Sequence, residues 1–370
     1  MPAATLDSCH TPALASWKAL GERYIADMSV TTNALGPSQK ALDAVIASLR
    51  VDTEHYPDAQ ASDAREALAK FLCIGNKKLI LMGNGASELI DLTIRITTGR
   101  FRLGPYPAQY SEYERVAHSG NREVIPFDSP LAAGVTVVIR PNSPTGDFMT
   151  LPEVRALLDS KEGIFIFDES FLPFMGPNWA EHSAVNLLGQ YGSRVMVIHS
   201  WTKIWSCPGL RLGSVTTTEE NIARMEHIQV PWSCSALAQR FAIASVDDGE
   251  YMVKTWAMVR RWKVLILHEL ECLNEDLHSL GLSVTFQRNE NSPLWVPWIF
   301  VTTDSEATAL LAVEAGEECG VPIRWCRSHG LAASLRLGIR DPDAHETLFR
   351  AIKAKFVARM QQAAAHPPAH

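Results

Sequence analysis

Several features that mark whole classes of protein are missing from this sequence. No apolar run approaches the ~18 residues of a membrane-spanning helix, and the N-terminal segment is polar, without the apolar centre of a signal peptide. Basic residues do not prevail, since 34 Lys and Arg stand against 41 Asp and Glu, and no basic stripe is interleaved with aromatic residues. We therefore expect neither a membrane nor a nucleic acid as a partner.

Cysteines with the spacing of a metal or redox motif are missing too. The seven cysteines are odd in number and scattered, and no two of them form a CxxC pair. We interpret them as reduced thiols of a cytoplasmic protein, and we expect no metal site.

What remains is an ordinary globular composition, 46% apolar and 20% charged. The length of 370 residues suits a two-part enzyme. We expect a large domain over residues 41–262 and a small domain formed by residues 1–40 and 263–362. The tail 363–370, AAAHPPAH, is expected to be disordered.

Short apolar runs alternate with helix-length segments from about residue 64 to 215, which indicates an α/β fold with a mostly parallel central sheet. The predicted strands of this sheet are Leu79–Met82, Val135–Ile139, Ile164–Phe167 and Val195–Ile198, with a helix at Ser87–Arg95. A long amphipathic helix is expected near 250–275. A smaller α+β unit is expected to contain strands Leu282–Phe286, Trp298–Thr302 and Leu335–Ile339 and helices Ala307–Cys319 and His345–Gln361.

A polar or glycine-rich cluster follows each of the four strands of the large sheet. Ligands of such sheets bind outside the carboxyl ends of the strands. The clusters are GNGASE (83–88), RPNSPTG (140–146), DES (168–170) and HSWTK (199–203). Their coincidence predicts one site at one edge of the sheet.

Lys203 ends the last of these clusters, between Trp201 and Trp205. A lysine in an apolar pocket loses its proton more easily, and its neutral amine can form a Schiff base with an aldehyde. The alternative is a surface lysine whose stem passes two indoles.

A phosphate-binding set surrounds this lysine in the sequence. A Pro-Gly turn can return Arg211 toward Lys203, where its guanidinium joins the hydroxyls of Ser200 and Thr202. GNGASE adds glycines and the start of a helix, which suit an anion. It is not a dinucleotide fingerprint, because Glu88 stands where the third glycine belongs. An arginine paired with a surface carboxylate is the alternative.

Asp168 follows the third strand. A carboxylate there can pair with a protonated ring nitrogen and make the ring an electron sink, although a turn or N-cap aspartate is a common alternative. Lysine, phosphate pocket and ring-facing aspartate together describe pyridoxal 5'-phosphate (PLP).

The same motifs recur in a known order. They are NALGP (33–37), HYPDA (55–59), GNGASE (83–88), YSEY (110–113), PNSPTG (141–146), DESF (168–171), SWTKIWSCPGLRLG (200–213) and LRLGIR (335–340). From about Asn33 to Arg340 the chain resembles the class I/II PLP-dependent aminotransferase family of fold type I. Within it, the chain is similar to the branch of histidinol-phosphate aminotransferase and threonine-phosphate decarboxylase, and VPWSCSALA (230–238) is more similar to the decarboxylase.

The resemblance implies a role for each residue around the cofactor. Lys203 would form the Schiff base and shuttle protons, Asp168 would pair with the pyridine nitrogen, and Tyr110 would stack on the ring. The phosphate would be held by Ser200, Arg211 and the amides of Gly85 and Ala86, with the hydroxyl of Thr202 beside them.

Three further residues are implied at the substrate and at a subunit contact. Arg336 would grip the α-carboxylate of the substrate, with Asn33 near it. Tyr56 would reach the phosphate of the neighbouring subunit's cofactor, which implies a homodimer with shared active sites. Core tyrosines and a structural ion pair are the alternatives.

The sequence departs from the family pattern at three places. Ser143 replaces an asparagine, and Phe171 a tyrosine, that hydrogen-bond the 3-hydroxyl of the ring in the family, so we predict an altered Schiff-base pKa. The decarboxylase branch carries a His-Gly-Gly segment for the phosphate of its substrate, whereas His10 is followed by Thr11 and Pro12. This predicts a substrate other than phosphothreonine.

The resemblance implies an enzyme acting at the α-carbon of a free L-amino acid. Transamination is favoured, decarboxylation is the alternative, and elimination or cyclisation comes third. A non-catalytic PLP-binding regulator is least favoured, because Lys203 is present. Arg324, Arg327 and His329 are expected at the surface, or alternatively at an acidic substrate side chain.

Overall fold

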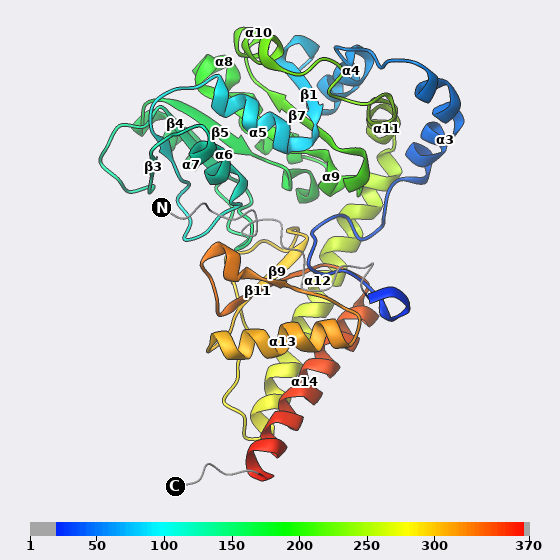
Figure 1. Ribbon diagram of the computed structural model, residues 1–370, viewed down its shortest axis with the longest axis vertical. Helices are drawn as coiled ribbons and strands as arrows, with labels where there is room; N and C mark the ends of the chain where they lie inside the picture. Colours follow the sequence, from blue (N-terminus) through cyan, green and yellow to red (C-terminus); the bar gives the residue numbers. More distant parts are fainter. Residues whose placement is uncertain (1–19, 366–370) are drawn as a thin grey trace. The chain divides into compact units, whose positions relative to one another are not determined.

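The computed structural model describes residues 20–365, and this part of the chain divides by its packing into two units (Figure 1). The large unit comprises Leu35–Ser143 and Asp147–Ala257. The small unit comprises the described parts of Met1–Ala34 and Met258–His370, together with Pro144–Gly146. The domain boundaries predicted from the sequence, at residues 41 and 262, remain a prediction. His10 and the last residues of the predicted tail, 366–370, lie outside the described residues, whereas helix α14 (Pro342–Ala365) continues beyond residue 363.

The large unit is built on a seven-stranded sheet. Its strands are β1 (Ile80–Asn84), β2 (Phe101–Arg102), β3 (Val124–Ile125), β4 (Val135–Ile139), β5 (Ile164–Asp168), β6 (Val195–Ser200) and β7 (Leu212–Thr216). Their spatial order is β1-β7-β6-β5-β4-β2-β3. Only β7 runs antiparallel to its neighbours, β1 and β6. The predicted α/β fold with a mostly parallel sheet is confirmed, and all four predicted strands form.

Helices cover both faces of this sheet because its strands are apolar on both sides. Val137 and Ile166 face the cluster with α5 (Gly85–Arg95), α6 (Glu112–Ser119) and α10 (Glu219–Ile228). Their strand neighbours face the opposite cluster with α7 (Leu151–Ser160), as the period of two requires. The other helices of this unit are α3 (Gln39–Glu54), α4 (Ser62–Phe71), α8 (Leu188–Tyr191), α9 (Trp201–Ile204) and α11 (Ala236–Val246).

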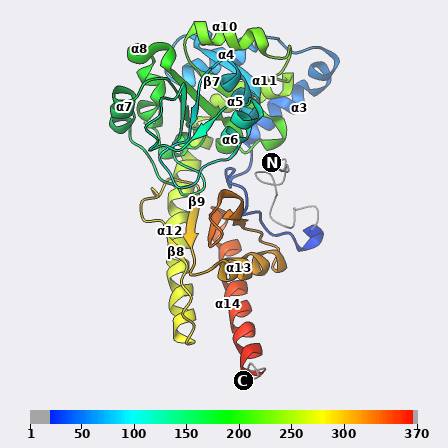
Figure 2. The ribbon, with the colours of Figure 1, turned by 60° about the vertical axis from the view of Figure 1, so that its left-hand side comes forward.

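The small unit has an antiparallel sheet of four strands in the order β10-β11-β9-β8. They are β8 (Gln287–Arg288), β9 (Trp298–Thr302), β10 (Arg324–Trp325) and β11 (Ser334–Gly338). Its core joins this sheet to α13 (Glu306–Glu318), α14 and the C-terminal half of α12 (Gly249–Ser279), which Figure 2 shows from a second side. The predicted α+β character of this unit is therefore confirmed.

The predicted strand Leu282–Phe286 is wrong. These residues alternate between more and less exposed positions as in a strand, but none of them belongs to one. The side chain of Asn274 takes the main-chain hydrogen bonds of Phe286 instead: its Oδ1 accepts from the Phe286 N–H at 2.8 Å, and its Nδ2 donates to the Phe286 carbonyl at 3.1 Å. Ladder pairing begins only at Gln287, opposite Thr302.

Among the described residues, no helix is long and apolar enough to cross a membrane, and no group of three potential metal ligands occurs.

Candidate active site

The register of β7 brings Arg211 and two of the predicted clusters, GNGASE and HSWTK, to one edge of the large sheet. Gly213 lies opposite Gly83 of β1 and opposite Ser200 of β6. Because Arg211 stands two residues before Gly213, it lies at the same edge as the glycine-rich turn and the end of β6. The sequence predicted β6 and the polar residues at its end. It did not predict β7, the antiparallel strand that joins these clusters.

Arg211 and the start of α5 form a compact anion-binding corner. The Gly85 N–H donates to the Arg211 carbonyl at 2.9 Å, and a Cβ on Gly85 would collide with the Arg211 guanidinium. Gly85 has φ +76°, which an L side chain rarely adopts. A Cβ on Gly213 would come within 2.6 Å of the Ala86 nitrogen, so only glycine fits there. An arginine beside the first amides of a helix of this length suits a phosphate.

The hydroxyl side chains after β6 complete this corner. Ser200 is half-buried at the end of the strand. Thr202 is buried, and its hydroxyl has no hydrogen-bond partner among the described residues. A buried polar atom without a partner costs free energy, so this hydroxyl fits a site that a ligand completes.

Lys203 lies in α9, on a different side of the helix from the two tryptophans. Trp201 and Trp205 are one turn apart, fully buried, and stack with ring centroids 4.9 Å apart. Lys203 is half-buried, and its Nζ lies 5.9 Å from the centroid of the Phe171 ring. Its charge lowers the pKa of Asp168, so the amine and this carboxyl share one space. The indoles therefore anchor α9 in the core, and Phe171 is the aromatic surface that the lysine faces.

Asp168, the last residue of β5, is a buried carboxyl surrounded by donors. Its Oδ1 accepts from the Ser170 N–H at 3.0 Å and its Oδ2 from the Tyr113 hydroxyl at 2.8 Å. Burial raises the pKa of Asp168, while the hydroxyl and N–H of Ser170, the Tyr113 hydroxyl and Lys203 lower it. In the motif YSEY (110–113), only Tyr110 was predicted to have a role. Its second tyrosine, on the buried face of α6, is the one that reaches Asp168.

Tyr110 and the loop after β4 lie in the same unit. Tyr110 is half-buried and meets Tyr113 edge-on, with ring centroids 6.5 Å apart. Ser143 is buried in that loop, and Phe171 is buried with its ring 6.4 Å from that of Phe174. All the residues expected at the ring thus have the burial that a cofactor site requires.

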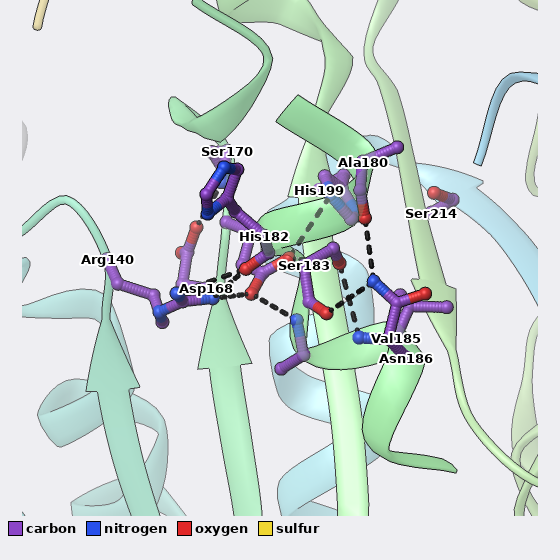
Figure 3. A network of polar contacts seen from close by, with 12 residues as sticks. Arg140, Asp168, Ser170, Ala180, His182, Ser183, Val185, Asn186, His199 and Ser214 are labelled. Carbon is purple, nitrogen blue, oxygen red and sulfur yellow. Dashed lines mark hydrogen bonds and ion pairs between the residues drawn. The ribbon is translucent and has the colours of Figure 1, made fainter. Parts of the chain in front are cut away.

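A buried ion pair that the sequence analysis missed joins the ends of β4 and β5 (Figure 3). Arg140 pairs with Glu169, and both side chains are fully buried. Arg140 also donates to the carbonyls of Met149 at 2.9 Å and His182 at 3.1 Å. Glu169 accepts from the Ala184 N–H at 2.8 Å. This network fixes Glu169, the residue that follows Asp168.

His199, the neighbour of Ser200, is buried beside this pair. Its Nε2 lies 3.9 Å from Glu169 Oε2, and its ring stacks on Trp201 at 4.7 Å. Burial lowers the pKa of His199 to about 3, so the imidazole is neutral. The His199 ring therefore packs at the end of β6 without adding a charge there.

The predicted substrate residues belong to the small unit. Asn33 is buried, and Arg336 is half-buried in β11, where its Nη2 donates to the Ser29 carbonyl at 2.8 Å. Arg324 lies opposite Arg336 in the ladder of β10 and β11. The surface expectation is wrong for Arg324 and His329, which are half-buried. It holds for the third residue of that group, Arg327, which is exposed and pairs with Glu306.

Tyr56 lies in the large unit and is 81% exposed, so it is not a core aromatic. Its ring packs against that of Trp232, which is 48% exposed, with centroids 4.8 Å apart. The structure of one chain brings neither ring to Lys203.

Comparison with known proteins agrees with this geometry. The family "Aminotransferase class I and II" matches residues 25–352. The histidinol-phosphate aminotransferase of Bdellovibrio bacteriovorus is 29% identical over 360 residues, which cover 90% of each chain. Two solved structures share the fold. That of histidinol-phosphate aminotransferase from Sinorhizobium meliloti, in complex with pyridoxal-5'-phosphate, has a TM-score of 0.77 at 17% identity and covers 94% of this chain and 98% of the other. L-threonine-O-3-phosphate decarboxylase from Porphyromonas gingivalis has a TM-score of 0.74 at 20% identity, covering 90% of this chain and 100% of the other.

The residues of the large unit fit PLP. Its phosphate suits the corner of Gly85 and Arg211, its aldehyde suits Lys203, and its ring nitrogen suits the buried acid Asp168. This chain therefore belongs to the class I and II aminotransferases, a family of enzymes whose cofactor is pyridoxal phosphate.

Proposed function

We propose that this protein is an aminotransferase that acts at the α-carbon of a small amino-acid-type substrate with an anionic group. The observation that carries the proposal is the meeting of Lys203, Asp168 and the Arg211 corner at one edge of the large sheet. PLP, when bound, supplies an aldehyde and a ring that stores the electron pair left on the α-carbon.

Lys203 and Asp168 have different roles. The amine of Lys203 moves protons, and the carboxyl of Asp168 stays charged. The Nζ of Lys203 is half-buried on a short helix that two stacked tryptophans anchor. An amine held in place can take and return a proton at the same point in each turnover. Asp168 receives two hydrogen bonds within 3.0 Å and the field of Lys203, which keep it an acceptor for a protonated ring nitrogen.

The anion corner orients the cofactor. Arg211 is exposed at the sheet edge, so its guanidinium is accessible to a phosphate. We infer that Ser200, Thr202 and the amides of Gly85 and Ala86 bind the same phosphate, because they surround Arg211 at the ends of β1 and β6. Tyr110 then packs on the ring, and Ser143 and Phe171 line its remaining edge.

The small unit contains a pair of neighbouring arginines. Arg336 and Arg324 lie opposite each other on neighbouring strands. Burial lowers the pKa of His329 to about 3, and the charges of the two arginines add to this effect. We propose that Arg336 binds the α-carboxylate, with Asn33 near it. The names of the three similar proteins above specify phosphorylated substrates, which agrees with an anionic substrate here.

Decarboxylation is the second candidate. The fold resembles the threonine-phosphate decarboxylase as well as the aminotransferases, at a TM-score of 0.74. Product mass separates the two reactions, because transamination yields an oxo-acid and decarboxylation an amine.

We also propose a homodimer. Large apolar side chains are exposed together on α3 and on the loops around Tyr56 and Trp232, and they include Ile46 at 67% and Val230 at 70%. Exposed apolar patches of this kind mark contact surfaces, and a second copy would cover this one and bring its Tyr56 to a neighbouring site. Sedimentation of the wild type and of a Tyr56→Ala/Trp232→Ser variant tests this. A monomeric wild type would remove the proposal.

A direct test of the function uses the purified protein with added PLP. The wild type should show a visible absorbance band and retain PLP as a mass adduct after borohydride reduction. With an oxo-acid supplied to accept the amino group, it should convert one amino acid to its own oxo-acid. Lys203→Ala should lose both adduct and turnover. The matched control is Lys161→Ala, since Lys161 also faces a phenyl ring, with its Nζ 5.2 Å from the Phe127 centroid. An adduct that survives Lys203→Ala would contradict the assignment.

A further inference from the structure

We propose that Tyr113 and Ser170 are positioning residues that together hold the Asp168 carboxylate ionised and fixed for the cofactor. We also propose that Ser170 ties this carboxylate to the phosphate-binding end of β6. The inference rests on the proposed role of Asp168 at the ring nitrogen. It goes beyond that role because it assigns functions to two hydroxyls that do not themselves contact the cofactor.

Tyr113 is placed by the inner face of α6. With Val116 and Ala117, three and four residues further on, it is buried in the core on one face of the sheet. Its ring is fully buried, and its hydroxyl donates to Asp168 Oδ2 at 2.8 Å. A tyrosine hydroxyl inside a core needs such a partner, and this one uses the carboxylate of the site.

Ser170 makes a bridge of hydrogen bonds. Its N–H donates to Asp168 Oδ1 at 3.0 Å, and its hydroxyl lowers the pKa of the same carboxyl. Its Oγ also accepts the N–H of Ser200 at 2.8 Å. Ser170 therefore accepts from the end of β6 with its Oγ and donates to the Asp168 carboxylate with its N–H, so one residue joins the two.

The electrostatic balance at Asp168 makes these donors necessary. Burial raises the pKa of its carboxyl above the ordinary value, while the Ser170 and Tyr113 hydroxyls lower it. Lys203 also lowers it by its charge. The neighbouring Glu169 is compensated by Arg140 within a fully buried pair. Removing a donor hydroxyl shifts the carboxyl toward its protonated form, which no longer attracts a protonated ring nitrogen.

The experiment measures PLP affinity as a function of pH for the full-length protein and three variants. Tyr113→Phe and Ser170→Ala each remove one hydroxyl, and Asp168→Asn removes the charge. Quenching of tryptophan fluorescence by PLP gives the dissociation constant. The matched control is Tyr191→Phe, since the Tyr191 hydroxyl donates to Asp159 at 2.7 Å before β6, away from the site. Affinity for inorganic phosphate is measured in parallel.

Each hydroxyl variant should bind PLP about 10-fold more weakly near neutral pH, as for a lost hydrogen bond to a charged group. The pH below which PLP affinity is lost should move upward, because the carboxyl of Asp168 then protonates at higher pH. Phosphate affinity should stay unchanged in Tyr113→Phe, since that hydroxyl touches only the carboxylate end. A general loosening of the site would weaken both ligands and leave the pH midpoint in place.

The outcomes separate this inference from the function on which it rests. If Asp168→Asn abolishes tight PLP binding while both hydroxyl variants keep the affinity and pH midpoint of the wild type, the positioning role is wrong and the proposed function stands. If Asp168→Asn itself binds PLP like the wild type, the role of Asp168 is wrong and the inference falls with it. If the pH midpoint of PLP affinity moves no further in Tyr113→Phe or Ser170→Ala than in Tyr191→Phe, the hydroxyl removed in that variant has no positioning role.

Discussion

Replacing Arg140 by methionine should destabilise the large unit by about 3–5 kcal/mol, the usual cost of removing one partner of a buried ion pair. The side chain of Arg140 has no exposed surface, and neither has that of its partner Glu169. The variant leaves the Glu169 carboxylate buried with only hydrogen bonds from Ser183 and the Ala184 N–H. It also removes the donors to the Met149 and His182 carbonyls.

The cost should shrink as the pH falls. Burial raises the pKa of Glu169, and the charge of Arg140 opposes that rise. Without Arg140 the folded-state pKa lies further above the unfolded one, near 4.5. The folded variant then binds a proton that the unfolded chain does not, so its stability increases as the pH is lowered toward that unfolded value. The wild type should show a weaker trend of the same sign from this group.

The assay is urea unfolding without added PLP, followed by tryptophan fluorescence at several pH values. Arg140→Met/Glu169→Gln removes both charges and should cost less than the single change. The control is Arg100→Met, because Arg100 pairs with Glu123 at 2.6 Å at the surface and should contribute only about 0–1 kcal/mol. The reasoning fails if Arg140→Met costs no more than Arg100→Met, or if the double variant is as unstable as the single one.

Three further changes probe the site and its surroundings. Gly85→Ala forces a Cβ into the Arg211 guanidinium at φ +76°, so affinity for inorganic phosphate and PLP should fall about 10-fold or more, measured by fluorescence titration. Phe171→Tyr adds a donor beside the 3-hydroxyl of the ring and should lower the Schiff-base pKa in a visible pH titration; an unchanged midpoint would place Phe171 elsewhere. His199 has a pKa of about 3 when folded and about 6.5 when unfolded, so the wild type should lose about 1.5 kcal/mol of unfolding free energy between pH 6.5 and 5. His199→Phe should remove that slope in urea titrations, and an identical slope in both proteins would refute it.

Local pattern was sufficient for the framework of the large unit. Val135–Ile139 is a strand over the predicted residues, and β5 and β6 begin where predicted and run only one or two residues longer. Short apolar runs separated by helix-length segments favour a parallel sheet, because parallel neighbours need long crossover connections. The same rule placed the polar residues that follow these runs at one edge.

The prediction from hydrophobic pattern failed where a side chain, and not a neighbouring strand, takes the main-chain hydrogen bonds of a segment. Leu282–Phe286 has the alternation of a strand, yet Asn274, which lies on α12, takes the hydrogen bonds of Phe286. The residues of the segment itself do not indicate that Asn274 is their hydrogen-bond partner. The expected surface position of Arg324 failed for a similar reason, since only the register of β10 and β11 sets it opposite Arg336.

The sequence by itself determined the fold class. It also predicted the site residues Lys203, Asp168 and Arg211, because each lies at or just after a strand end or a tight turn that its own neighbours specify. Tertiary structure decided which groups surround them. The hydroxyl of Tyr113 meets a carboxyl 55 positions away, and Arg140 meets Glu169 29 positions away. Such pairs depend on the register of strands and on the rotation of α6 over the sheet, which are set by the packing of the whole unit and not by residues nearby in the chain.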